Sequence, residues 1–183
     1  FHFKYILDKL GIKKGGDPDV PLKTLDVDSM ELHDGIQWTT KFREWFMKYH
    51  GYDPVAWLPA LSGWTLVDED ESARFQYDYQ KTVSDLLILS HYTTGSEICA
   101  EYGLQLAGEA GGPGPPIWNT CPVDALKALG NVDIPRGELW ISNRNNIFLV
   151  KEIASASHIY GKPLVDAESW TTWWRWKDSP FIR

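Results

Sequence analysis

The fold is decided by residues 147–170, which read IFLVKEIASASHIYGKPLVDAESW. Apolar and small residues recur at helical spacing along 147–160, Gly161 is a typical helix stop, and an apolar strand-like run follows at 163–167. The helix face expected to be buried comprises Val150, Ile153, Ala154 and Ser157. Because a helix that leads directly into a short strand is half of a βαβ unit, this stretch predicts an α/β fold with parallel strands.

The same alternation continues upstream. Strands are predicted at 22–30, 104–110 and 138–141, and helices at 41–49, 72–102 and 124–129, the second of these broken at Thr94-Gly95. A (β/α)₈ TIM barrel and a doubly wound sheet both use such units. No Gly-x-Gly-x-x-Gly or Walker loop follows a predicted strand, which weakens the nucleotide-binding alternative. Since a complete barrel needs ~250 residues, residues 1–183 are predicted to form part of a single (β/α)₈ catalytic domain.

Composition narrows the class of partner. The net charge is −7 and Lys and Arg are not clustered, which argues against nucleic acid. No run approaches the ~18 apolar residues of a membrane span. The chain holds 10 Trp, 8 Tyr and 7 Phe. Aromatic faces beside carboxylates suit carbohydrate, so a carbohydrate substrate is the predicted partner. Packing of the Trp side chains in the core is the alternative.

Four glutamates lie at or just past predicted strand ends: Glu31, Glu109, Glu138 and Glu168. Active sites of α/β barrels are assembled at this edge. Cleavage of a glycosidic bond needs one carboxylic acid and one carboxylate, whose pKa values are pushed apart by their environments, for example by burial against Trp170. Helix capping or pairing with arginine is the alternative for each glutamate. Asp26, Asp28 and Glu31 also offer oxygen ligands for a hard cation.

An ordered set of motifs resembles the α-L-rhamnosidases of glycoside hydrolase family 106. The residues that carry this resemblance are Asp28-Ser29-Met30-Glu31, Trp38-Thr39, Gly51-Tyr52-Asp53-Pro54, Gly108-Glu109-Ala110, residues 134–140 (IPRGELW), residues 156–163 (ASHIYGKP) and residues 167–171 (AESWT). They extend over nearly the whole chain from about Leu25 onward. The ordered set is far more specific than any single motif.

The resemblance implies a (β/α)₈ glycoside hydrolase that removes terminal α-L-rhamnose from plant or microbial polysaccharide with inversion, often with calcium near the sugar. Glu31 would be the general acid and Glu168 the general base. Glu138 would be a sugar or calcium ligand and Glu109 a supporting residue of the substrate pocket. We also expect Trp140 and Trp170 to bind the substrate. Such enzymes are large, multidomain and secreted, so the remaining domains of a larger parent chain are expected partners.

Two features depart from the family pattern. Met30 stands where an aromatic residue is common, and residues 170–176 are unusually rich in Trp, so a related sugar is an alternative to rhamnose. A non-catalytic carbohydrate-binding barrel is the alternative function. A partial barrel exposes strand edges, so the isolated chain is predicted to be inactive. A secreted, periplasmic or cell-surface location is expected, with the targeting segment outside this chain.

Overall fold

The computed structural model describes residues 2–30, 32, 35–110, 122–140 and 147–170. Its four strands are β1 (Thr24–Val27), β2 (Gln105–Glu109), β3 (Ile134–Trp140) and β4 (Asp166–Trp170). They form one sheet in the order β1-β2-β3-β4, and every neighbouring pair is parallel. The helical elements are α1 (His2–Lys9), α2 (Phe42–His50), η1 (Pro54–Ser62), α3 (Glu69–Leu87), η2 (Ile88–Thr93), α4 (Thr94–Glu101), α5 (Ala125–Gly130) and α6 (Ile147–Tyr160).

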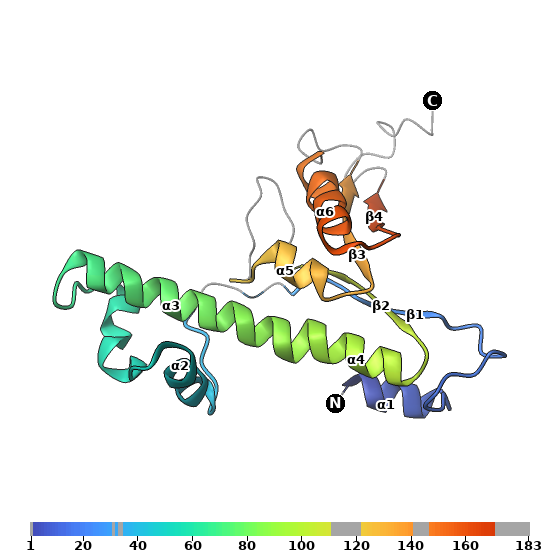
Figure 1. Ribbon diagram of the computed structural model, residues 1–183, viewed down its shortest axis with the longest axis horizontal. Coiled ribbons are helices and arrows are strands. Elements are labelled where there is room, and N and C mark those ends of the chain that lie inside the picture. The colour runs from blue at the N-terminus through green and yellow to red at the C-terminus, as the bar shows by residue number, and fades with distance from the viewer. Residues whose placement is uncertain (1, 31, 33–34, 111–121, 141–146, 171–183) are drawn as a thin grey trace.

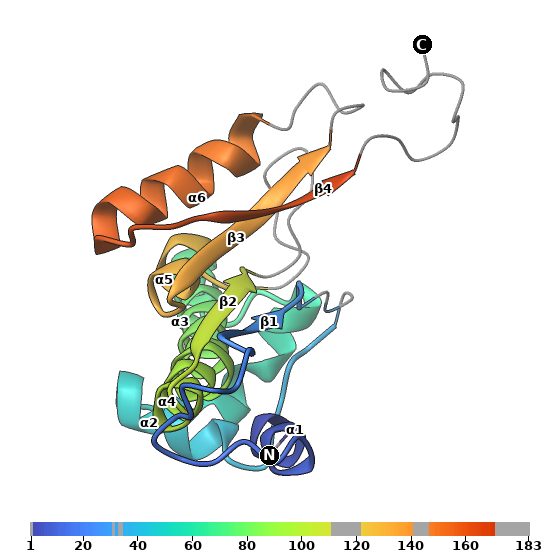
Figure 2. The same cartoon turned by 90° about the vertical axis from the view of Figure 1, so that its right-hand side faces the viewer.

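The sheet is a curled half-barrel. Sequential parallel strands require a crossover between each pair, and the helices supply these crossovers. Figure 2 shows the four strands fanned with a strong twist, with α6 against β3 and β4 and the α3–α4 helix behind β1 and β2. The predicted α/β fold, a partial (β/α)₈ barrel with parallel strands alternating with helices, is confirmed.

The main core lies between the sheet and its helices. Leu106 of β2 and Val132 before β3 are fully buried there, together with Leu129 of α5 and Ile153 of α6. A Cβ atom added at Gly137 would lie 2.9 Å from Ile153, so β3 and α6 pack more closely than a side chain at this position allows. The sheet face that carries Leu106 and Gly137 is therefore the outer face of the half-barrel.

The helix between β1 and β2 differs from the prediction. The expected break at Thr94-Gly95 is wrong, because the π-helical turn η2 joins α3 to α4 and the chain stays helical from Glu69 to Glu101 (Figure 1). Gly95 instead permits close packing, since a Cβ atom there would lie 3.1 Å from Leu106 and 3.2 Å from Phe3 of α1. The glycine marks a helix contact rather than a helix end.

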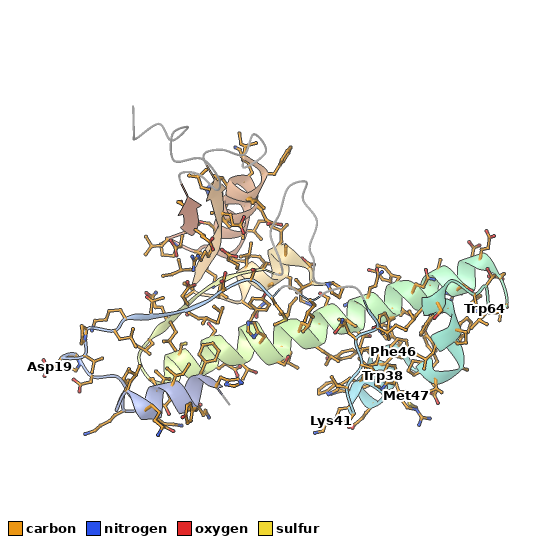
Figure 3. The ribbon with its side chains drawn as sticks, turned by 180° about the vertical axis from the view of Figure 1, so that it is seen from behind. Asp19, Trp38, Lys41, Phe46, Met47 and Trp64 are labelled. Atoms are coloured by element: carbon orange, nitrogen blue, oxygen red, sulfur yellow. The ribbon has the colours of Figure 1, made fainter. Side chains whose placement is uncertain are left out.

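A second core holds α2, η1 and α3 together. Its buried residues are Phe42, Phe46, Ala60, Phe75, Tyr79 and Val83. Figure 3 shows Trp38, Phe46 and Met47 gathered at α2, away from the sheet. Asp53 caps η1 by accepting a hydrogen bond from the amide of Val55. Much of the aromatic content therefore serves packing here, as the alternative interpretation predicts.

Some predicted boundaries also shift. Strand β3 begins at Ile134 rather than Glu138, and β4 begins at Asp166 rather than Pro163, so Glu138 and Glu168 lie within strands. Helix α6 has the predicted bounds. Of its expected face, Ile153 is buried and Val150, Ala154 and Ser157 are half-buried, and the other buried residues of the helix are Leu149 and Ala156. Among the described helices, none is both long enough and apolar enough to cross a bilayer.

Candidate active site

Charged side chains gather on the inner face of the half-barrel. In a parallel sheet, register partners project to the same face and successive residues to opposite faces. Arg136 is the register partner of Glu109 and of Asp166, and Glu138 is the partner of Glu168. These residues alternate with Gly137, which faces α6. The inner face, including the expected base Glu168, is therefore polar, whereas the outer face is apolar.

Arg136 is the central cation of this face. Its guanidinium is ion-paired with Asp26 of β1, and its Nε lies 3.5 Å from Oε1 of Glu109 and 3.8 Å from Oδ2 of Asp166. Its Nη2 lies 3.8 Å from Oε2 of Glu168. The side chain is 16% exposed. One arginine on β3 thus faces carboxylates from the other three strands.

Glu109 is the most deeply buried carboxyl of the described residues. Its side chain is fully buried, and neither carboxyl oxygen makes a hydrogen bond within the described part of the protein. Burial, together with the negative charges of Glu138, Asp28, Glu168 and Asp166, raises the pKa of Glu109 to about 8. This direction holds although Arg136 lies near, since desolvation is the largest cause. At neutral pH, Glu109 is therefore expected to be protonated unless a bound cation replaces the proton.

Asp28, Glu109 and Glu168 form a candidate cation site. Each offers one carboxylate oxygen, and these oxygens lie within 4.8 Å of one another. Oxygen ligands at such spacing suit a hard divalent cation such as Ca²⁺. A cation there would also satisfy the buried oxygens of Glu109, which makes the donor set chemically consistent with calcium.

The structure brings together part of the predicted site. Glu109 and Glu168 both belong to the candidate cation site. Glu138 of β3, the predicted metal ligand, is half-buried and is the register partner of Glu168, but it is not one of the three residues of that site. Glu31 and the side chains of Trp140 and Trp170 lie outside the described residues, so their predicted roles stay predictions.

Asp28 was predicted as a candidate oxygen ligand of a cation together with Asp26 and Glu31, and it lies in the candidate cation site, whereas Asp26 pairs with Arg136. Arg136 was given no role beyond its place in the IPRGELW motif. A signal for Arg136 existed, because a charged residue two positions before Glu138 in a strand projects to the same face. This inference requires that Arg136 lie in the same strand as Glu138, and the sequence placed the start of that strand at Glu138 instead of Ile134.

A curled parallel α/β sheet with an acidic inner face defines the class of (β/α)-barrel proteins that assemble their sites at strand ends. Within that class, the family model described as alpha-L-rhamnosidase, glycoside hydrolase family 106, matches residues 2–181. The chain therefore belongs to the family 106 α-L-rhamnosidases.

Two similar proteins are much longer than this chain. The solved structure of a rhamnosidase from Novosphingobium sp. PP1Y superposes with a TM-score of 0.68 at 35% identity, and the match covers 84% of this chain and 15% of that one. A protein from Formosa agariphila named "Putative beta-glucuronidase" is 29% identical over 96% of this chain and 14% of its own length. The chain thus spans about a seventh of each of these relatives.

Proposed function

We propose that this chain contributes acidic active-site residues to a glycoside hydrolase that cleaves terminal α-L-rhamnosides, within a single (β/α)₈ catalytic domain of a longer secreted or cell-surface protein. Family membership across residues 2–181 is the observation that carries the proposal. The carboxylates of the inner face support it, because glycoside hydrolysis needs an acid and a base on either side of the bond.

In the proposed mechanism, Glu31 protonates the leaving oxygen and Glu168 activates water on the opposite face of the sugar. Inversion requires room for that water, so the two carboxyl groups should lie ~6.5–9.5 Å apart. Asp28 directly follows β1 and precedes Glu31 by three residues in the sequence. A carboxylate oxygen of Asp28 lies within 4.8 Å of one of Glu168 in the candidate cation site. The segment that carries Glu31 therefore begins beside the proposed base.

The remaining inner-face residues would hold the sugar. Glu138 beside Glu168 would accept hydrogen bonds from sugar hydroxyls or bind a cation, and Trp140 and Trp170 would stack on the ring. Calcium, when bound by Asp28, Glu109 and Glu168, would supply positive charge that organises hydroxyl groups. Glu109 would then be a buried ligand rather than the reacting acid, consistent with its supporting role.

A glucuronide is the second candidate substrate, suggested by the name of the Formosa agariphila protein. The charge of the inner face disfavours it. Arg136 is already surrounded by Asp26, Glu109, Asp166 and Glu168, so the carboxylate of a uronic acid would meet mainly negative charge. A neutral deoxy sugar avoids that repulsion, and we therefore favour rhamnose.

Hydrolysis of aryl glycosides by the full-length protein that carries this chain tests the proposal. An aryl α-L-rhamnoside and an aryl β-D-glucuronide would be compared, with Glu31→Gln and Glu168→Gln variants, and NMR would record the anomeric form first released. We expect turnover of the rhamnoside to the inverted sugar, reduced by at least ~100-fold in both variants. Glycan binding without turnover of any aryl glycoside would favour a non-catalytic binding barrel.

A further inference from the structure

Arg136 has no assigned role in the proposed hydrolysis, although it lies at the centre of the inner face. It is the register partner of Glu109 on one side and of Asp166 on the other, so it projects from the middle of the sheet. Its side chain is largely buried, and its Nε makes no hydrogen bond within the described residues. A guanidinium with an unused buried N–H is costly, so a structural salt bridge alone does not account for it.

Arg136 makes a close ion pair with Asp26 and a longer contact with Glu168. The side chain of Asp26 in this ion pair is 46% exposed. The distance from Nη2 of Arg136 to Oε2 of Glu168 is 3.8 Å, longer than the ~2.7–2.9 Å of a charge-assisted hydrogen bond. Arg136 therefore attracts Glu168 without forming a hydrogen bond to that oxygen.

We propose that Arg136 is a positioning residue for Glu168, and this inference rests on the role of Glu168 as general base in the proposed function. Asp26 holds one edge of the planar guanidinium, which directs another edge toward Glu168. A lysine carries a single ammonium group instead of a planar guanidinium with several N–H donors. It can balance the charge of the carboxylates but cannot bridge Asp26 of β1 and Glu168 of β4 in the same way.

The test uses Arg136→Lys and Asp26→Asn in the full-length protein, with Arg74→Gln as the matched control. Arg74 is an exposed arginine paired with Glu71 on α3, remote from the sheet. Since a misplacement of about 1 Å costs roughly 100-fold in rate, we expect kcat on the aryl α-L-rhamnoside to fall about 100-fold in Arg136→Lys. In Asp26→Asn we expect a fall of about 10-fold. KM should change less than about 3-fold, and the control should match the wild type.

Crystal structures of the wild type and of Arg136→Lys separate this inference from the proposed function. A Glu168 carboxylate that moves in the variant supports positioning, even if the wild type turns over no rhamnoside and the proposed function fails. A carboxylate that stays in place overturns the inference, whatever the activity. Full activity of Arg136→Lys, or a loss expressed in KM alone, also overturns it. Arg136→Gln is avoided because it removes the positive charge as well as the planar guanidinium, so it would not separate positioning from charge balance.

Discussion

The Nε atom of Arg136 lies 3.5 Å from Oε1 of Glu109, yet neither atom makes a hydrogen bond within the described residues. The two residues are register partners on β3 and β2, so the sheet itself brings them together. Buried ionisable groups of the inner face are therefore concentrated around Arg136 and Glu109.

The stability of the domain should fall as pH rises from about 5 to 8 when divalent cations are chelated. Burial raises the pKa of Glu109 to about 8, so between its unfolded and folded pKa values the folded state binds the proton that the unfolded state has lost. That contribution is complete below the unfolded pKa and is lost as pH rises through 8. In Glu109→Gln, the thermal midpoint should vary less with pH over this range. An unchanged pH dependence would contradict the buried, protonated state of Glu109.

Calcium should stabilise the protein through Asp28, Glu109 and Glu168. A cation bound only by the folded state adds about 2.7 kcal/mol at 100 times its Kd, which thermal unfolding with Ca²⁺ and with chelator would detect. Asp28→Asn should weaken this effect by at least ~10-fold in apparent Kd, because a charged ligand is lost. The control is Asp19→Asn, an exposed aspartate on the loop before β1 (Figure 3). Equal calcium responses in both variants would argue against this site.

Gly103→Ala should destabilise the fold by about 3 kcal/mol, the sum of a left-handed backbone penalty and a steric clash. Gly103 has φ +69°, and a Cβ atom there would lie 2.8 Å from the Cα of Gly16. Gly51→Ala is the matched control, since Gly51 has φ +79° but open space around it and should cost only about 1 kcal/mol. Thermal unfolding of both variants would measure the difference. Equal losses would show that the approach of Gly16 does not matter.

Val67→Gly should stabilise the protein by about 0.5–1 kcal/mol. Val67 has φ +64°, unfavourable for a β-branched residue, and it is 86% exposed, so little packing is lost on its removal. The same change at Val55, within η1, should destabilise the protein because glycine weakens a helical segment. A decrease in thermal midpoint for Val67→Gly would indicate a contact made elsewhere in the full-length protein.

The alternation of helices and parallel strands could be predicted from the sequence, because hydrophobic spacing and glycine stops are local signals. Helix α6 was predicted with its observed bounds, and the motif set placed the chain in its family. Local spacing predicted the burial of Ile153 on α6 but not that of Leu149 and Ala156. Leu149, Ile153 and Ala156 are buried because α6 packs against Gly137 of β3.

The assembly of the site depends on how the strands pair in the folded protein. The sequence indicated that Glu109 and Glu168 lie near strand ends, but their meeting with Asp28 depends on the register of strands far apart in the chain. Arg136 became visible as the central cation only once β3 was seen to begin at Ile134 and to lie between β2 and β4. Burial and proximity of charges are properties of the packed sheet, so the raised pKa of Glu109 arises from the fold rather than from its neighbours in sequence.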